Sequence, residues 1–272
     1  MEAQKQVKRV GKKSRGISAS IVIACCFILA VSFYVFILGN PANFVDNNPA
    51  NHPLNGNMLG TMHKGGYVVP LILTLLVTVI ALSVERIFAL GKAKGQGNLT
   101  DFVYDVKAEL AKGDIAAAEA LCAKQKGSVA AIVDAGLKKY KEMETAGIPK
   151  EQKIEEIKAE LEEATALELP SFQQNLPIIA TISTLGTLLG LLGTVLGMIR
   201  SFGALASEGA ADSVALSAGI SEALINTACG IATGALAIIT YSYFTSKIDN
   251  LTYAIDEMGF ALTQTYAATH NA

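Results

Sequence analysis

The sequence is poor in the groups that mark metal sites, disulfide-stapled domains and nucleic-acid-binding surfaces. It has three histidines and four cysteines in 272 residues, and no spacing among them is typical of a metal site or a disulfide framework. The formal net charge of -2 gives no basic field that would attract a polyanion. We therefore expect no metal, no disulfide framework and no nucleic-acid partner.

Motifs for catalysis and for nucleotide binding are also missing. No phosphate-binding glycine loop occurs, and no nucleophile stands with a base and an orienting residue in a recognisable pattern. The sequence predicts a protein that is not an enzyme and needs no cofactor. Any energy that it uses must come from elsewhere.

Hydrophobic residues are what the sequence has in excess. They make up 51% of the chain, and the mean hydropathy is +0.39. Four apolar segments each reach the roughly 20 residues needed to cross about 30 Å of hydrocarbon. The first, residues 17–38, follows a basic start as a signal peptide would, but its apolar run is long and no clean cleavage site follows. We predict an all-α polytopic membrane protein with four transmembrane helices and a helical cytoplasmic extension.

The basic residues predict the orientation of these spans. They gather in residues 1–16 and again after the second span, whereas the first loop has only Lys64. This pattern predicts cytoplasmic termini in a bacterial inner membrane. The expected order is a basic N-terminus (1–16), an additional transmembrane helix (17–38), a periplasmic loop (39–66), a transmembrane helix (67–91), a cytoplasmic helical region (92–175), a transmembrane helix (176–200), a periplasmic loop (201–213), a transmembrane helix (214–246) and a cytoplasmic C-terminal helix or tail (247–272).

Capping residues divide the cytoplasmic region into helices. We expect Asp101 to cap a helix that ends near Lys112, and Asp114 to cap a second helix that Gly127 stops. A third, residues 128–144, is amphipathic, with apolar side chains near one face. A fourth begins near Pro149 and is expected to continue into the membrane, with a bend at Pro170 or Pro177.

Small residues recur every four positions in the last two spans. At that spacing they form a flat stripe on which another helix can lie closely, either in the same chain or in a second copy. The expected helix-packing residues are Gly186, Gly190, Gly193, Gly197, Gly230 and Gly234. Arg86 and Arg200 stand near the ends of spans, and we expect them to anchor the chain at the membrane interface.

Polar side chains also lie inside these two spans. Glu222 is costly in hydrocarbon, and such a carboxylate is a functional candidate by default, although it can also fix the packing of a neighbouring helix. Asn226 follows it by one helical turn, and Thr227 is adjacent. Thr194 lies in the preceding span. Threonines in membrane helices often bond their own helix, so the structural alternative stays open for both.

Two sequence phrases carry a family resemblance. Gly190-Leu-Leu-Gly-Thr-Val-Leu-Gly197 and Gly219-Ile-Ser-Glu-Ala-Leu-Ile-Asn-Thr227 together resemble the paired signature of the ExbB/TolQ/MotA proton-channel family, and are closest to its ExbB and TolQ branch. The resemblance extends from about residue 65 to about residue 256. One departure is Gly186-Thr187, where the family usually has Ala-Pro.

The resemblance implies a partner complex. It implies a homopentamer around the single membrane helices of an ExbD-like dimer, whose aspartate takes up and releases protons, and a TonB-like protein that carries the work to outer-membrane import. Thr194 and Thr227 match the threonines near that aspartate. Glu222 matches the family glutamate, whose role could be in conduction, in structure or in both, and Asn226 is a further pore-lining candidate. We expect these four proton-pathway residues to face a shared central cavity. The alternatives are a TolQ-like subunit of envelope constriction and, with less support, a MotA-type stator or a non-conducting membrane scaffold.

Overall fold

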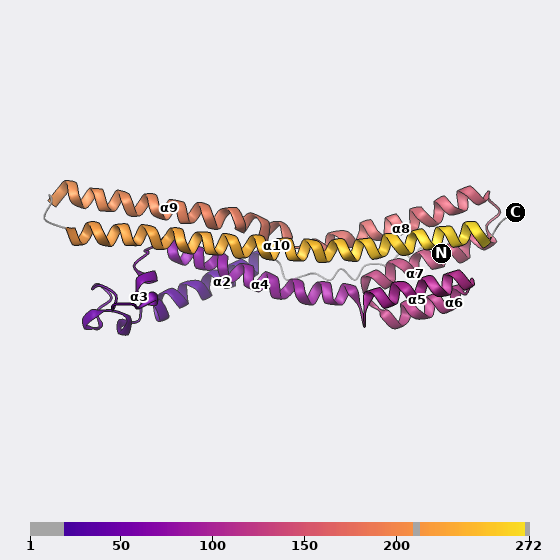
Figure 1. Ribbon diagram of the computed structural model, residues 1–272, viewed down its shortest axis with the longest axis horizontal. Helices are drawn as coiled ribbons and strands as arrows, with labels where there is room; N and C mark the ends of the chain where they lie inside the picture. Colours follow the sequence, from indigo (N-terminus) through magenta and orange to yellow (C-terminus); the bar gives the residue numbers. More distant parts are fainter. Residues whose placement is uncertain (1–18, 209–212, 270–272) are drawn as a thin grey trace, which may run out of the picture. The chain divides into compact units, whose positions relative to one another are not determined.

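The computed structural model describes residues 19–208 and 213–269, which fold almost entirely into helices (Figure 1). The expected basic segment 1–16, the centre of the second loop and the last three residues lie outside the described residues. The chain divides into two compact units. The first combines residues 1–81 with 181–237, and the second combines residues 82–180 with 238–272. Helices α4, α9 and α10 contribute residues to both.

Four helices are long and apolar enough to cross a membrane, as the sequence predicts. The first is α2 (Ala19–Phe33), which continues as the π-helical turn η1 (Tyr34–Leu38). The others include α4 (Val68–Lys94), α9 (Leu176–Glu208) and α10 (Ser213–Thr269). A helix satisfies every backbone N–H and C=O within its own segment, which is the condition for crossing hydrocarbon. The protein is therefore an all-α polytopic membrane protein.

Helices α9 and α10 form a closely packed hairpin in the first unit. A Cβ atom at Gly230 would lie 2.5 Å from the carbonyl oxygen of Gly186, and one at Gly234 would lie 2.7 Å from that of Ser183. At Gly197 it would meet the Cβ atom of Ala223 at 2.9 Å. All six expected packing glycines contact the other helix of this hairpin, so the close approach that they allow is made within one chain.

The segment expected as an irregular loop, residues 39–66, contains short helices. They are the 3-10 turns η2 (Pro41–Asn43) and η3 (Val45–Asn47) and the helix α3 (Met58–His63). Asn43 holds them together, because its amide donates to the carbonyls of Ile37 and Leu38 and its oxygen accepts from Asn57. We call residues 39–66 the cap. Asparagine side chains in the cap therefore bond these short turns to one another.

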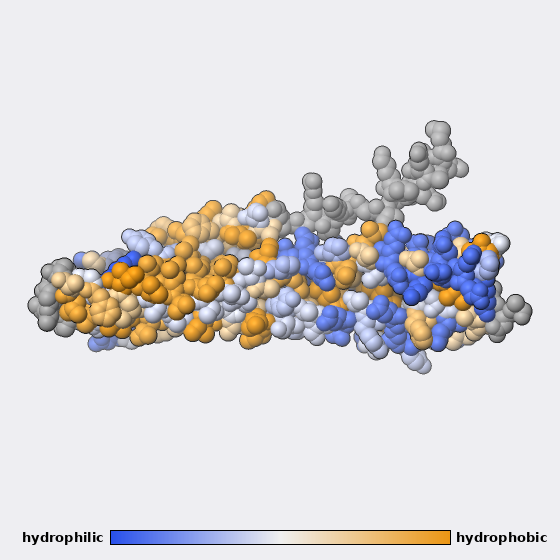
Figure 2. Space-filling model, turned by 90° about the horizontal axis from the view of Figure 1, so that it is seen from above, coloured by the Kyte–Doolittle hydropathy of each residue, from blue (hydrophilic) through white to orange (hydrophobic). Residues whose placement is uncertain are grey.

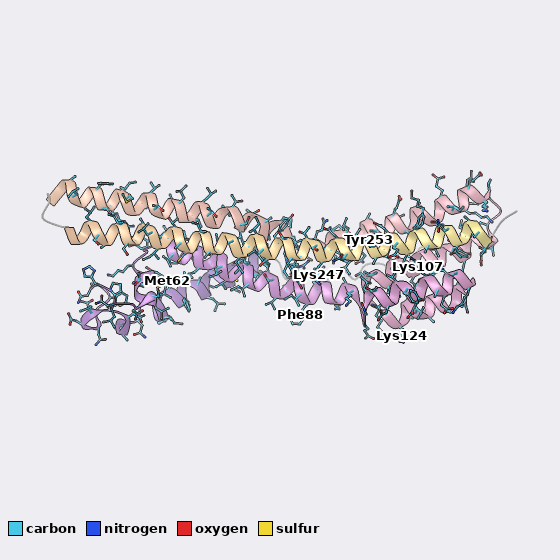
Figure 3. All side chains as sticks on the ribbon, viewed as in Figure 1. Met62, Phe88, Lys107, Lys124, Lys247 and Tyr253 are labelled. Atoms are coloured by element: carbon cyan, nitrogen blue, oxygen red, sulfur yellow. The ribbon has the colours of Figure 1, made fainter. Side chains whose placement is uncertain are left out.

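The second unit packs α5 (Leu99–Lys112), α6 (Ile115–Gln125), α7 (Gly127–Thr145) and α8 (Lys150–Phe172) with the last part of α10 around one apolar core. The predicted apolar face of α7 is buried in that core. Lys107 of α5 reaches Glu257 of α10, with Nζ 2.7 Å from Oε1 (Figure 3). The expected cap at Asp114 is confirmed, because its side chain accepts from the N–H of Ala117 at 2.8 Å.

Three expected helix boundaries are wrong. Asn98, and not Asp101, caps α5, because its side chain accepts from the N–H of Thr100. Gly127 was expected to stop α6, but α6 ends at Gln125 and Gly127 is the first residue of α7. The chain changes direction between them at Lys126, which has φ of 57°. Helix α8 does not continue into α9. It ends at Phe172, and a short non-helical segment separates it from α9, which begins at Leu176. We call this segment the α8–α9 break; within it Asn175 has a left-handed conformation, with φ of 65°.

Arg86, which we expected to anchor the chain at the membrane interface, is buried beside this break. Its side chain is 1% exposed, and its guanidinium donates to the carbonyls of Ser171 and Phe172 at the end of α8. Glu85 pairs with the same guanidinium and also accepts from Asn175, at 3.1 Å. The carbonyls that end a helix have no partners inside it, so a buried cation there is favourable.

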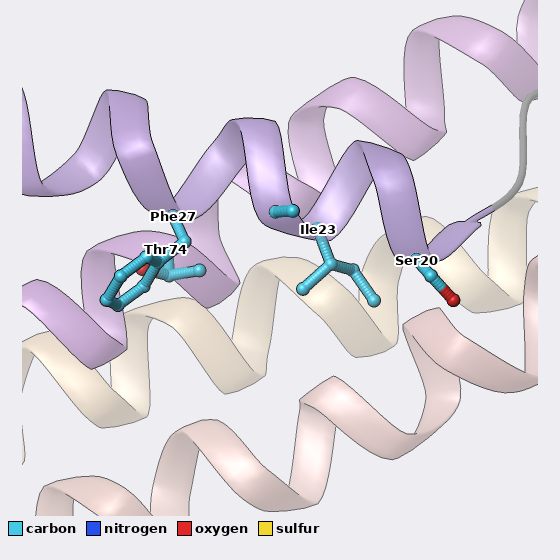
Figure 4. Close-up of a pocket in the computed structure, with 5 residues that line it drawn as sticks. Ser20, Ile23, Phe27 and Thr74 are labelled. Atoms are coloured by element: carbon cyan, nitrogen blue, oxygen red, sulfur yellow. The ribbon is translucent and has the colours of Figure 1, made fainter.

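The two units differ in surface composition. Hydrophobic residues gather over the first unit and hydrophilic residues over the second (Figure 2). A shallow apolar groove lies between α2 and α4, lined by Ser20, Ile23, Ala24, Phe27 and Thr74 (Figure 4).

Candidate functional site

The candidate site lies where α9 and α10 approach most closely. A Cβ atom at Gly190 would lie 3.0 Å from the carbonyl oxygen of Asn226 and 3.2 Å from the Cα atom of Thr227. Because a glycine lets the two backbones meet, the side chains on either side of Gly190 can reach across the hairpin. Thr194 lies one helical turn along α9, on the same side of the helix as Gly190.

Thr194 and Thr227 are hydrogen-bonded to each other through their hydroxyls. Both hydroxyls also lie within bonding distance of the Gly190 carbonyl, at 3.2 and 3.3 Å. A hydroxyl has one proton to donate and two lone pairs to accept with. The pair can therefore take two orientations, in which either threonine is the donor, and in both it keeps a lone pair for a third group.

Glu222 is paired with Arg200 across the same hairpin, nearer to the loop that joins the two helices. The guanidinium Nη1 donates to Oε1 of the carboxylate at 2.6 Å. The Glu222 side chain is 17% exposed and that of Arg200 is 50% exposed. The guanidinium also lies 5.9 Å from the ring centre of Tyr67, within the range of a cation–π contact. Arg200, which we expected to be an interfacial anchor, thus has a charged partner within the chain.

Asn226 is buried, with a residue exposure of 1%. Its amide nitrogen donates to the carbonyl of Gly65 at 2.9 Å, and its amide oxygen is a buried acceptor with no partner among the described residues. In one copy of the chain it lies against Gly65 and Gly193 and lines no open surface. A pore-facing role for Asn226 stays a prediction.

The four residues expected to face a shared cavity, Thr194, Glu222, Asn226 and Thr227, fall into two clusters. One is the hydroxyl pair, and the other holds Glu222 and Asn226 with Arg200 and the turn Gly65–Tyr67. Sequence reasoning missed this turn, because Asn226 and Gly65 are 161 positions apart and no local pattern links them. The signal that could have found Arg200 is its position, since a cation and a carboxylate face each other near the linked ends of a predicted hairpin.

The cap brings two further ionisable groups near the second cluster. Burial lowers the pKa of His63, and the neighbouring Lys64 ammonium lowers it further. Burial also lowers the pKa of Lys64, and the Glu222 carboxylate opposes that shift. The Lys64 ammonium donates to the carbonyls of Pro49 and Ala50 at 2.9 and 3.0 Å. In the described part of the chain, no group of three or more His, Cys, Asp or Glu side chains could hold a metal ion.

A family model matches the segment of the chain that contains the hairpin. Residues 118–257 match the model of the family described as "MotA/TolQ/ExbB proton channel family". Over 93 residues the chain is 40% identical to the putative biopolymer transport protein ExbB-like 3 of Synechocystis sp., which is 34% of this chain and 44% of that protein. Over 121 residues it is 31% identical to the Tol-Pal system protein TolQ of Pseudomonas aeruginosa, which is 44% of this chain and 52% of TolQ.

An archaeal protein shows a similar match. The chain is 35% identical over 95 residues to the putative biopolymer transport protein ExbB homolog of Methanothermobacter thermautotrophicus, which is 35% of this chain and 33% of that protein. The matches thus span about half or less of the length of these relatives.

Proposed function

Because the chain belongs to the MotA/TolQ/ExbB proton channel family, we propose that it is the ExbB-like subunit of an inner-membrane motor driven by the proton-motive force. In this proposal five copies surround an ExbD-like dimer with one membrane helix per chain. Proton passage moves the helices, and a TonB-like protein carries the work to outer-membrane import. The termini and residues 92–175 lie in the cytoplasm. One charge crossing 100 mV supplies about 2.3 kcal/mol, which is sufficient to drive such steps repeatedly.

The Thr194–Thr227 hydroxyl pair is the observation that carries the proposal. It lies in an apolar hairpin, and in either orientation it keeps an acceptor for a third group. A partner's carboxyl group needs a donor when it is ionised and an acceptor when it is protonated. A pair that reverses its orientation serves both states, because hydroxyls donate and accept. We propose that these two residues face the proton-carrying aspartate of the partner.

Reconstitution with the partner tests the proposal. The partner is expected to be encoded beside this chain, as a short protein with one membrane helix that carries an aspartate. With both proteins in liposomes, an imposed membrane potential should acidify the lumen. The chain alone, and the pair with that aspartate changed to asparagine, should give no flux. Flux from the chain alone, or none from the complete pair, contradicts the proposal.

A TolQ-like role in envelope constriction is the second candidate, because TolQ of Pseudomonas aeruginosa is among the relatives. Deletion of the gene separates the two roles. Loss of outer-membrane import with normal cell division supports the ExbB-like role. Delayed constriction with normal import supports the TolQ-like role.

A further inference from the structure

We propose that Glu222 is a positioning residue, which forms a fixed ion pair with Arg200, fastens the turn Gly65–Tyr67 to the hairpin and does not carry the transported proton. We call the group of Arg200, Glu222, Asn226 and this turn the latch. The family match gives no role to Arg200 or to the turn. The evidence is the set of contacts that the hairpin makes with three consecutive residues.

Each residue of the turn meets a different side chain of the hairpin. The Gly65 carbonyl accepts from Asn226 Nδ2 at 2.9 Å. Gly66 lies directly against the Glu222 carboxylate. The ring of Tyr67 lies beneath the Arg200 guanidinium, 5.9 Å from its centre. Three adjacent contacts to both helices of the hairpin fix the position of the residues just before α4 begins at Val68.

Gly66 is required by both its conformation and its surroundings. Its φ is 70°, a left-handed value that is strained for residues with a side chain. A Cβ atom there would lie 2.5 Å from Oε1 of Glu222 and 3.4 Å from Nη1 of Arg200. The turn is therefore shaped so that its backbone approaches the ion pair directly.

The ion pair gives the carboxylate a permanent partner. A guanidinium cannot release its proton in a protein, so the pair is neutral only while Glu222 is ionised. A proton that arrived at Glu222 would break the pair and leave the cation alone in a partly buried place, which is unfavourable. The Lys64 ammonium on the cap side adds a second positive charge near the carboxylate. This arrangement suits a fixed charge better than a relay.

The latch is also separate from the hydroxyl pair. Among the described residues, no side-chain hydrogen bond joins Glu222, Asn226 or Arg200 to Thr194 or Thr227. The threonines bond each other and the carbonyl of Gly190. A proton passed along hydroxyls and carbonyls at Gly190 would have no bonded route to Glu222 within one chain.

The residues of the cap that precede the turn are held in place by contacts of their own. His63 stacks on Tyr34 with ring centres 4.7 Å apart, and the Tyr34 hydroxyl donates to the His63 carbonyl at 3.0 Å. Lys64 bonds two carbonyls of the cap. The latch therefore joins the cap, and through it the turn η1, to the hairpin that holds the threonines.

Hydrogen exchange in the full complex tests whether the latch holds the turn against the hairpin. This measurement does not depend on proton flux. Glu222→Gln leaves the Arg200 cation unpaired, and we expect exchange of the amides of residues 63–68 to rise about tenfold, because a partly buried charge loses its partner. Combining it with Arg200→Gln removes both charges and permits an amide–amide bond. We expect the exchange rates of residues 63–68 in that double variant to lie within about threefold of those in the unaltered protein. Unchanged exchange in Glu222→Gln overturns the latch.

Proton flux with the partner tests the second part, and this arm rests on the proposed function. The Arg200→Gln, Glu222→Gln double variant should keep flux within about threefold and keep the pH profile of the unaltered complex, because no transported proton binds at position 222. Loss of flux in a double variant with protected exchange would show that the carboxylate itself carries protons, and would overturn the assignment. If the unaltered complex carries no flux, the proposed function fails, and the exchange arm still decides the fastening.

A matched pair of glycine variants tests whether the contact between the turn and the ion pair is what holds the turn. Gly66 and Gly56 both have positive φ, at 70° and 80°, but a Cβ atom at Gly56 would meet nothing within 4 Å. Gly56→Ala reports the conformational strain alone, whereas Gly66→Ala adds the contact with Glu222. Exchange in residues 63–68 should rise several-fold more in Gly66→Ala than in the control. Equal effects would show that the ion pair does not hold the turn.

Discussion

Thr194 and Thr227 share a hydrogen bond between α9 and α10 although 33 positions separate them in the sequence. The bond forms because Gly190 and Gly230 bring the two backbones together beside it. Each hydroxyl can also bond a carbonyl of its own helix, which is the ordinary behaviour of threonine in a membrane helix. The bond across the hairpin is what distinguishes these two threonines from threonines that bond only their own turn.

Removing both hydroxyls tests their role in proton transfer. We expect the Thr194→Val, Thr227→Val double variant to assemble normally and to lose about 100-fold of its proton flux, since a positioned proton donor or acceptor typically contributes that much or more. Replacing both with serine should keep most of the flux. Thr187→Val is the control, because that hydroxyl bonds Ser183 of its own helix. Full flux in the double valine variant would return the threonines to a structural role.

Leucine substitutions test the contact between the hairpin helices. In Gly190→Leu the new side chain meets the α10 backbone at Asn226 and Thr227, so the helices must separate. We expect a loss of roughly 2 kcal/mol or more in stability, as overpacking typically costs. Gly91→Leu, on α4, is the control, because among the described residues nothing lies within 4 Å of a Cβ atom there. Thermal unfolding followed by circular dichroism is the measurement, and equal stability of the two variants would contradict the packing argument.

Composition and periodicity predict much of this fold. The four spans follow from apolar length alone, because the hydrocarbon sets one minimum for every crossing helix. The hairpin follows from two long spans with a short link. The glycine contacts follow from small residues at every fourth position. These signals are local, so a single sequence contains all of them.

The partners of the polar residues could not be predicted in the same way. Arg86 and the Ser171 carbonyl are 85 positions apart, and Asn226 and Gly65 are 161 apart. Such pairs depend on how helices pack, and no sequence period encodes that. The wrong cap at Asp101 has a different cause, since Asn98 has the same capping chemistry three residues earlier. Local chemistry permits both caps, and the packing of α5 selects one.

Arg86 should be more important for stability than its exposed counterpart Lys107. Arg86→Met leaves the last carbonyls of α8 and the Glu85 carboxylate without their cation, and we expect a loss of about 3 kcal/mol, as for other buried pairs. The side chains of Lys107 and Glu257 are 43% and 35% exposed, so Lys107→Met should cost about 0.5 kcal/mol. Chemical unfolding of the purified protein compares them. Similar losses would mean that Arg86 does not hold the α8–α9 break.

Acid should loosen the cap through His63. Its ring stacks on Tyr34 and meets the edge of Phe44, and burial lowers its pKa below the ordinary 6.5. The unfolded cap therefore binds the proton more readily than the folded cap. The contribution to stability is complete above pH 6.5 and is lost as the pH falls through the lowered value. Protection factors, which divide out the pH dependence of unprotected amide exchange, should fall for residues 58–66 as the pH falls from 7 to 5, a range that follows from the histidine pKa.

The control for this pH effect is a ring that cannot be protonated. His63→Phe keeps the stacking and should make the protection factors of the cap insensitive to pH over the same range. His52→Phe, in the same cap, should leave the pH dependence unchanged. A pH dependence that survives in His63→Phe would assign the effect to another group.

Cysteine labelling tests the orientation of the chain. The basic residues predict that Lys12 and the second unit lie on the cytoplasmic side and that the cap lies on the other. Lys126 is unsuitable as a probe site, since its φ is 57°, whereas Lys124 is exposed on α6 (Figure 3). Lys12→Cys and Lys124→Cys should react with a membrane-impermeant maleimide only after the membrane is opened. Asn55→Cys, exposed in the cap, should react in intact spheroplasts.

The native thiol of Cys122 will add little background, because burial raises its pKa to about 12. Labelling of Lys12→Cys and Lys124→Cys from opposite sides would rule out the four-span order, because two spans lie between these positions and two crossings return the chain to the same side.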